Sequence, residues 1–309
     1  MSAIETERLT KYYGSHRGVE EITIAVEQGE VFGFLGPNGA GKTTTIRTLL
    51  DLLHPTSGSA RVFGLDSRRD SVSIRRRLGN LPGDFGYGKL ATGREAVSLL
   101  ARLRNVSRLG NAVTLAERFQ ADLERPMGQL SRGNRQKIGL ILAVFHQPEL
   151  LILDEPTSGL DPLMQEEFLA LVREERRRGC AVFLSSHELD EVQRVCDRVG
   201  IIREGRVVAV ERVSELLEKT PHRVSVQFAE PAGIESLRGL AGVSDLEASD
   251  GRVRFKLAGA IDPVLKSIAA HTVLDLEVAH PTLEEVFLTY YQGESSDRGP
   301  SRVTEGETE

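Results

Sequence analysis

Eight residues, "GPNGAGKT" from Gly36 to Thr43, combine three glycines with a lysine and a hydroxyl group. They fit the pattern G-x-x-x-x-G-K-[ST], in which backbone N–H groups converge on phosphate oxygens because the glycines carry no side chains. In this pattern Lys42 reaches the β- and γ-phosphates, and the hydroxyl of Thr43 ligates Mg²⁺. The loop follows "VFGFL", a short apolar run typical of a buried strand, and it opens a helical pattern, which is the context that the motif requires.

Two further groups of polar residues follow apolar runs. "LLILDEP" ends in Asp154 and Glu155, and "CAVFLSS" is followed by His187. Beside a phosphate loop, Asp154 is placed to hold Mg²⁺ through water, Glu155 to polarise the attacking water, and His187 to donate a hydrogen bond to the γ-phosphate. A solvated strand end and a structural histidine are the alternatives, and the loop upstream favours the catalytic interpretation.

These residues need a parallel sheet whose strand ends meet at one edge. Strands alternate with helices up to about residue 217, which predicts a parallel α/β core. Residues 22–35 indicate two strands around a Gln-Gly turn, residues 162–178 an amphipathic helix, and "VGIIREGRVVAVE" a hairpin that turns at Glu204 and Gly205.

A boundary is expected near residues 218–222. Beyond it, the order strand-helix-strand-strand-helix-strand over residues 222–279 indicates a small α+β domain, with strands at 222–228, 244–249, 251–257 and 272–279. Helices are expected at 234–240 and 262–271, the second capped by Asp262, and at 282–292 with a capping box from Thr282 to Glu285. The polar residues 293–309 are expected to be disordered.

Bulk properties exclude several classes of protein. The chain has 309 residues and a net charge of -6, which argues against a nucleic-acid coat. Cys180 and Cys196 form neither a disulfide framework nor a metal-site spacing. The longest apolar run, residues 138–145, is too short to cross a bilayer, and the N-terminus lacks the features of a signal peptide. Any work on a membrane is therefore expected to go through a partner.

The order of five motifs, "GPNGAGKTT", "LSRGN", "LLILDEP", "SGLD" and "SSH", resembles the ATP-binding cassette (ABC) ATPases over residues 1–217. This resemblance implies a P-loop NTPase fold with a parallel core sheet, an antiparallel β subdomain and a helical subdomain at about residues 85–145. It also implies an aromatic platform for adenine, for which Tyr13 in "KYYG" is the best match and Tyr12 is possible. The resemblance implies ATP contacts along the whole loop, at Gly36, Pro37, Asn38, Gly39, Ala40, Gly41, Lys42, Thr43 and Thr44.

"LSRGN", residues 130–134, is similar to the family signature Leu-Ser-Gly-Gly-Gln. By this resemblance, the Ser131 hydroxyl and the Gly133 amide of one copy cap the γ-phosphate held by the loop of another. The implied assembly is a head-to-tail homodimer that encloses two ATP molecules with Mg²⁺, and Asp161 in "SGLD" belongs to the segment that runs between the two sites.

The sequence departs from the family at two places. Arg132 and Asn134 replace the usual Gly and Gln of the signature, which leaves Ser131 and Gly133 in place and predicts a working but altered site. Gly83 stands where the family usually carries Gln, sometimes Glu, which links the ATP site to the helical subdomain. Asp84 is the residue nearby that could take over this role.

The ending "HPTLEEVFL" and the segment "LLDLLHPTSGSARVFGLD" are similar to ATPase subunits of drug- and antibiotic-exporting ABC systems of the daunorubicin-resistance type. The function this implies is ATP hydrolysis that drives export through a separately encoded integral membrane permease. The chain would then lie at the cytoplasmic face of the membrane, with its C-terminal domain regulating or stabilising the dimer.

Two other functions remain open. A soluble cassette acting on DNA or the ribosome usually has coiled-coil insertions, zinc-binding cysteines or duplicated motifs, and the chain has none of these, so no nucleic-acid partner is expected. A non-catalytic scaffold would explain the altered signature and Gly83, but Glu155 and His187 argue against it.

Overall fold

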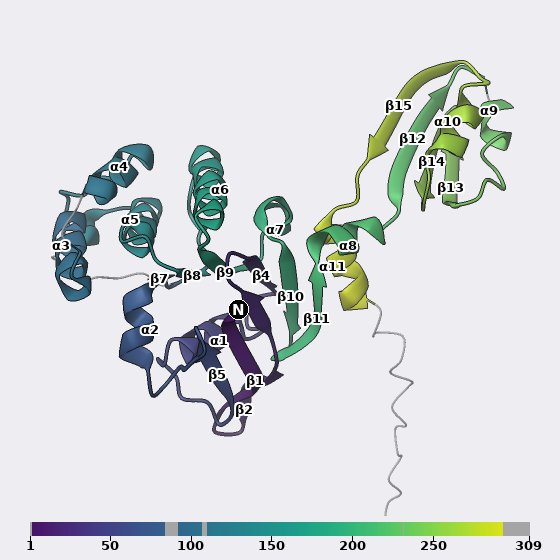
Figure 1. Ribbon diagram of the computed structural model, residues 1–309. Coiled ribbons are helices and arrows are strands. Elements are labelled where there is room, and N and C mark those ends of the chain that lie inside the picture. Colours follow the sequence, from purple (N-terminus) through teal and green to yellow (C-terminus); the bar gives the residue numbers. More distant parts are fainter. Residues whose placement is uncertain (1, 84–91, 107–109, 231, 293–309) are drawn as a thin grey trace, which may run out of the picture. The chain divides into compact units, whose positions relative to one another are not determined.

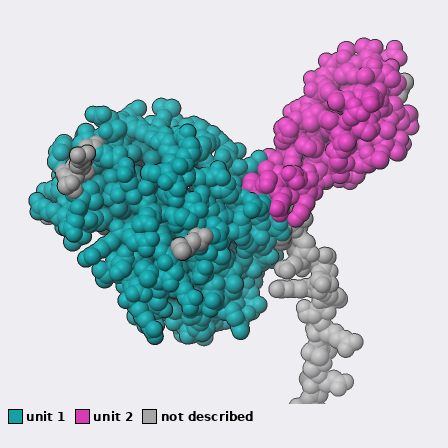
Figure 2. All heavy atoms as spheres, viewed as in Figure 1, with its two compact units in different colours: residues 1–212 teal, residues 213–309 magenta. Residues whose placement is uncertain are grey.

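The computed structural model describes residues 2–83, 92–106, 110–230 and 232–292. The chain divides into two compact units, Met1–Arg212 and Val213–Glu309 (Figure 2). The boundary falls before helix α8 (Val213–Glu218), which packs against α11 (Leu283–Gln292) of the second unit. The boundary expected from the sequence lies a few residues later, near residues 218–222. The difference arises because the sequence of a short helix does not reveal which unit the helix packs against.

Unit 1 is built on a six-stranded sheet in the order β11-β10-β4-β9-β8-β7, which can be followed in Figure 1. All neighbouring strands are parallel except the edge hairpin β10–β11, which turns at Glu204 and Gly205 as predicted. The strands are β4 (Val31–Leu35), β7 (Leu78–Leu81), β8 (Leu150–Asp154), β9 (Ala181–Ser186), β10 (Arg198–Arg203) and β11 (Arg206–Arg212).

The central strands β4, β8 and β9 are buried along their whole length. Their continuous apolar runs suit a parallel sheet that is covered on both faces. Phe183 of β9 stacks on Phe32 of β4 with ring centroids 5.8 Å apart, and Phe34 lies 5.4 Å from the same ring. The register pairs Phe32 with Phe183 and Leu35 with Ser186, so both strands end at the same edge of the sheet.

A second, antiparallel sheet has the order β2-β1-β5-β6, with β3 paired to β1. Its strands are β1 (Ser2–Tyr13), β2 (His16–Ile22), β3 (Ala25–Glu27), β5 (Ser57–Val62) and β6 (Leu65–Asp66). The long strand β1 ends at Tyr13, so this sheet carries the predicted aromatic residue at one of its strand ends.

The helices of unit 1 connect these strands. They are α1 (Lys42–Leu49), α2 (Ser71–Arg77), α3 (Gly93–Arg104), α4 (Gly110–Arg118), the 3-10 helix η1 (Met127–Gln129), α5 (Arg132–Val144), α6 (Pro162–Arg177) and α7 (Leu189–Val195). Helix α5 contacts α3, α4 and strand β7, and Figure 1 shows α3, α4 and α5 as one group of helices beside β7. The predicted helical subdomain corresponds to this group; its residues 85–91 and 107–109 lie outside the described residues.

Unit 2 contains a four-stranded antiparallel sheet in the order β13-β14-β12-β15. Its elements are β12 (His222–Phe228), α9 (Ala232–Glu235), β13 (Val243–Ser249), β14 (Arg252–Leu257), α10 (Asp262–Ile268) and β15 (Val273–Ala279). This is the element order that the sequence predicts. Helix α9 ends earlier than expected, and Asp262 is the first helical residue and not the cap, a position that Ile261 occupies without a side-chain hydrogen bond.

None of the helices in the described ranges is long and apolar enough to span a bilayer. The predicted disordered segment 293–309 lies outside those ranges. Cys180 and Cys196 are both buried free thiols.

Candidate functional site

The loop Gly36–Thr43 connects the buried strand β4 to helix α1, as its sequence predicts. Gly41 has φ +114°, a left-handed conformation that a residue with a side chain rarely adopts. At Gly36 the reason is space, because a Cβ would lie 2.4 Å from the backbone oxygen of Ile202 in β10. Pro37 and Asn38, in the middle of the loop, are exposed to solvent. The glycines therefore shape a turn whose backbone is open to a ligand.

Lys42 begins helix α1 and is almost fully buried. Its Nζ donates to the backbone oxygens of Gly36 at 2.6 Å and Pro37 at 3.4 Å, and it lies 3.1 Å from Oε1 of Glu155. Glu155 Oε1 accepts no hydrogen bond from any residue that the structure describes, so its attraction to the ammonium group is electrostatic. The loop and the acidic strand end are thereby joined through one cation.

Asp154 is the last residue of β8 and is buried. Its Oδ2 accepts from the hydroxyl of Thr43 at 2.8 Å, and its Oδ1 accepts from the hydroxyl of Ser185 at 2.5 Å. Ser185 faces Asp154 across the parallel β8–β9 register. The two predicted metal ligands, Thr43 and Asp154, are thus brought together, while Ser185 is a neighbour that the sequence pattern did not identify.

Glu155 follows directly and has φ +49°, a left-handed conformation for a residue with a side chain. Its N–H donates to the backbone oxygen and the hydroxyl of Ser185, both at 3.1 Å. Its Oε2 lies 2.6 Å from Nδ1 of His187, whose Nε2 is 3.3 Å from Oε1 of Glu188. The three predicted catalytic side chains, Lys42, Glu155 and His187, therefore converge at the carboxyl ends of β4, β8 and β9.

Gly83 also lies close to the carboxylate of Asp154. A Cβ built on it would lie 3.1 Å from Oδ2 of Asp154. The family's usual Gln at this position would need its neighbours to give way by a few tenths of an ångström, so the glycine suits the close approach to the acidic strand end. Asp84, the predicted substitute, lies outside the described residues.

Tyr13 ends β1 with 46% of its surface exposed, so it is not a packed strand residue. Its hydroxyl lies 3.4 Å from the Thr44 hydroxyl in helix α1, and Lys11 Nζ lies 5.5 Å from the ring centroid. Tyr12 is half-buried. Tyr13 therefore presents the more accessible ring beside the phosphate loop, which suits stacking on a base.

Ser131 caps helix α5 by accepting a hydrogen bond from the N–H of Asn134 at 3.3 Å. The neighbouring Gly133 packs closely against the segment after β8, since a Cβ there would lie 2.5 Å from the backbone oxygen of Gly159. Arg132 donates to the hydroxyl of Ser158 at 2.7 Å. The hydrogen bonds and ion pairs of the described residues include none that joins Ser131 or Gly133 to the loop Gly36–Thr43 of the same chain.

Asp161 caps helix α6, where its Oδ1 accepts from the N–H of Met164 at 3.0 Å and Pro162 follows in the first turn. This exposed carboxylate therefore has a local structural use. Its place in the segment 155–161, which leaves β8 and packs on the start of α5, suits the expectation that it acts between two sites.

Glu191 is a buried residue of this region that sequence reasoning did not find. It lies in α7 with 9% of its surface exposed; its Oε2 accepts from the Thr157 hydroxyl at 2.8 Å, and its Oε1 has no hydrogen-bond partner among the described residues. Burial raises its pKa to about 7, with smaller raising effects from Glu188 and Glu155. Its sequence context, an acidic residue in the first turn of a polar helix, gives no sign of burial.

We expect Glu191→Gln to change how the stability of unit 1 depends on pH. Because the folded-state pKa of about 7 is above that of an unfolded glutamate, the native protein loses stability as pH rises from about 4.5 through 7. The size of this loss is on the order of 3 kcal/mol, since each unit of pKa difference between the folded and unfolded states corresponds to about 1.4 kcal/mol. Thermal unfolding across this pH range should show a shallower slope for the variant; the same slope as in wild type would contradict the assignment.

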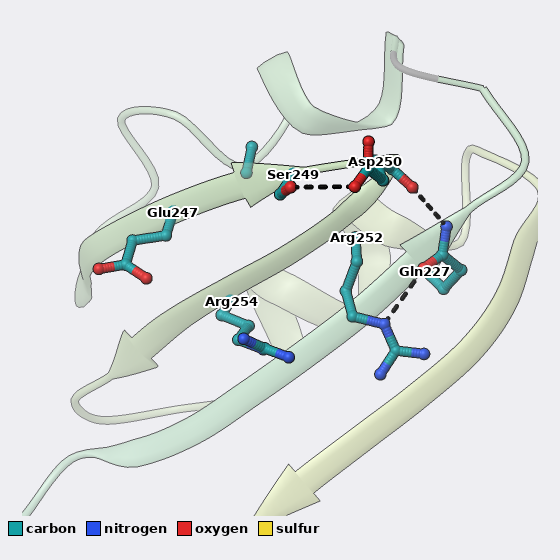
Figure 3. Close-up of a pocket in the computed structure, with 7 residues that line it drawn as sticks. Gln227, Glu247, Ser249, Asp250, Arg252 and Arg254 are labelled. Atoms are coloured by element: carbon teal, nitrogen blue, oxygen red, sulfur yellow. Dashed lines mark hydrogen bonds between the residues drawn. The ribbon is translucent and has the colours of Figure 1, made fainter.

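Unit 2 has a hollow of its own, about 480 Å³ in volume, on the open face of its sheet (Figure 3). Arg252 of β14 donates to the Gln227 side chain at 3.1 Å and pairs with Asp275 of β15 at 3.1 Å. Glu247 and Arg254 line the same hollow. Its lining contains no cysteine or histidine and no phosphate-type loop, so the candidate site is the one in unit 1.

Comparison with known proteins agrees with this geometry. The family model described as "ABC transporter" matches residues 19–158. The bacitracin transport ATP-binding protein BcrA of Bacillus licheniformis is 40% identical over 66% of this chain and 68% of its own length. The daunorubicin resistance ATP-binding protein DrrA3 of Streptomyces coeruleorubidus is 33% identical over 93% and 95%. The solved dimeric structure of the ABC transporter cassette MJ0796 shares the fold, with a TM-score of 0.63, 22% identity, and coverage of 68% and 98%.

Proposed function

Because the chain belongs to the family of ABC transporter ATP-binding proteins, we propose that it powers the export of a drug-like compound through a separate integral membrane permease. The protein binds and hydrolyses ATP as a member of that family. The single observation that carries the proposal is the convergence of Lys42, Glu155 and His187 at one edge of the parallel sheet. Export is supported by relatives named for bacitracin transport and daunorubicin resistance.

ATP would lie with its phosphates on the N–H groups of the loop Gly36–Thr43, at the start of α1. Helix N-termini with glycine-rich turns favour anions because unpaired N–H groups point at the ligand. The adenine would stack on Tyr13, whose exposed ring lies beside Thr44. Lys42, held by Gly36, would bridge the β- and γ-phosphates.

The donor set of this site fits Mg²⁺. Thr43 and Asp154 present two oxygen atoms 2.8 Å apart, and Mg²⁺ is usually held by one or two protein oxygens together with substrate phosphates. When bound, the ion supplies charge neutralisation on the phosphate oxygens. Ser185 holds Oδ1 of Asp154 and so orients the other carboxylate oxygen.

Glu155 is the residue that we assign as the base that polarises the attacking water, and His187 as a donor to the γ-phosphate. Their contact at 2.6 Å orients the carboxylate toward the strand ends. Lys42 would stabilise the charge that develops on the transferred group, because a fixed cation needs no rearrangement during the reaction.

Two copies would enclose two ATP molecules, with Ser131 and Gly133 of each completing the site of the other. Helix α5 begins beside these residues, so its dipole favours an anion there. The solved dimer of a cassette with the same fold supports this arrangement. The protein would act at the cytoplasmic face of the membrane, and no nucleic-acid partner is expected.

The proposal is tested by expressing the chain with its cognate membrane protein in an antibiotic-sensitive host and measuring tolerance to bacitracin-like peptides and anthracyclines. We expect tolerance to rise with the wild-type pair, and to return to the host level when the chain carries Lys42→Ala. Recovery of the chain on ribosomes or nucleic acid, with ATP hydrolysis stimulated by these and by no membrane protein, would overturn the proposal.

A further inference from the structure

The geometry points to Gln136 as the residue that positions Glu155 of its own chain. Gln136 lies in α5 with 5% of its surface exposed. Its Nε2 donates to the backbone oxygen of Glu155 at 3.1 Å and to that of Pro156 at 2.9 Å. Both partners can only accept, so the side chain must present its NH₂ group to them. The inference rests on the proposed function for one point, that Glu155 is the catalytic base.

Glu155 needs such support because of its backbone. A left-handed conformation at a residue with a side chain is unfavourable and persists where the surroundings over-determine it. The N–H of Glu155 is held by Ser185 of β9, and its carbonyl is held by Gln136 of α5. The peptide units on both sides of the Glu155 Cα are thus fixed from two different elements, and this fixes the direction in which the carboxylate leaves the backbone.

The first turn of α5 is attached to the same segment at two further points. Gly133 packs against the backbone of Gly159, and Arg132 donates to Ser158. Gln136 is one turn further along α5 and is the buried member of this set. The first turn of α5 and residues 155–159 therefore form one packed unit, in which Gln136 makes the contact that reaches the carboxylate residue itself.

Gln136→Met tests this role, because methionine has a similar length and helix propensity but no N–H donor. We expect kcat for ATP hydrolysis to fall on the order of 10–100-fold, the cost typical of a misplaced catalytic group. KM for ATP should stay close to the wild-type value, because the hydrogen bonds of Gln136 go to the backbone of Glu155 and Pro156 and not to the phosphate loop. A proportional loss of kcat and kcat/KM is the signature of an interaction that matters in the transition state.

The matched control is Gln165→Met on α6, where the glutamine is half-buried and makes no side-chain hydrogen bond to any residue that the structure describes, so it should tolerate the change. Gln136→Met removes two neutral hydrogen bonds, each worth about 1 kcal/mol, so its thermal midpoint should fall by less than about 10 °C. Gln165→Met should keep the wild-type midpoint. Wild-type kcat in Gln136→Met, or a fall in kcat matched by Gln165→Met, would overturn the inference.

Mixed dimers separate an effect on the chain's own Glu155 from an effect on the twin's site. The reference dimer pairs a wild-type subunit with a Glu155→Gln subunit and has one competent base. Placing Gln136→Met in the subunit that keeps Glu155 should slow hydrolysis as in the homogeneous variant. Placing it in the Glu155→Gln subunit should leave the rate of the reference dimer unchanged; equal slowing in both arrangements would overturn the inference.

Failure of the proposed function would look different. If Glu155→Gln alone retained turnover, the assignment of the base would be wrong, whatever Gln136→Met does. If Glu155→Gln hydrolyses ATP slowly and Gln136→Met hydrolyses it at the wild-type rate, Glu155 is still the base, but Gln136 does not position it.

Discussion

Glu155→Gln should bind ATP and hydrolyse it at least 10²-fold more slowly than wild type, because a positioned general base contributes on the order of 10²–10⁴-fold. The amide has the size of the carboxylate, so the packing around it is kept. It can still pair with His187, but it carries no charge opposite Lys42 and cannot draw a proton from water. Single-turnover hydrolysis together with equilibrium nucleotide binding measures the two quantities separately.

The control is Glu188→Gln, which removes the exposed neighbour of His187 Nε2 and should hydrolyse ATP at close to the wild-type rate. The slow variant should also accumulate as an ATP-loaded dimer, visible by size-exclusion chromatography with light scattering. Strictly monomeric Glu155→Gln with ATP, even beside the cognate membrane protein, would rule out the shared site.

Lys42→Ala should abolish ATP turnover and weaken nucleotide binding strongly. The side chain is buried and is the cation that joins the loop to Glu155, so its loss removes charge stabilisation and leaves the Oε1 atom of Glu155 without its ammonium partner. Removing one preorganised donor to a developing negative charge costs on the order of 10²–10³-fold in rate, and here the ground-state phosphate contact is lost as well.

Binding of a fluorescent ATP analogue and steady-state phosphate release measure this loss. Lys266→Ala in unit 2, which removes an exposed lysine paired with Asp262, is the control and should behave as wild type. Hydrolysis by Lys42→Ala at the rate of the control would show that the loop is not the phosphate site.

Much of the core could be predicted because its signals are local. The apolar runs of β4, β8 and β9 end in the residues that form the site, and in a parallel sheet such ends meet at one edge. The glycine pattern fixes the loop before any tertiary contact is known. Alternation and turn residues predict the α+β order of unit 2, whereas the short helix α9 ends at Glu235, before the apolar pattern of residues 234–240 does.

What the sequence could not reveal depends on contacts between distant elements. Gln136 reads as an ordinary polar residue of a helix start, and its bonds to Glu155 and Pro156 exist because α5 packs on the end of β8. Ser185 acquires its role from the register of β9 against β8. From the sequence, Glu191 would be expected to be exposed to solvent, but in the structure it accepts a hydrogen bond from the Thr157 hydroxyl. Such roles arise from tertiary packing, which periodicity and motif spacing do not encode.

The close packing of Gly133 on Gly159 affects how mutants of the LSRGN signature must be interpreted. Even a single methyl group at this position would lie 2.5 Å from the backbone oxygen of Gly159. This distance is too short, so the connection between β8 and α6, which ends at Asp161, would have to move. An inactive Gly133→Ala protein would therefore have two defects at once, one in the proposed contact with the phosphate held by a second copy and one inside its own subunit.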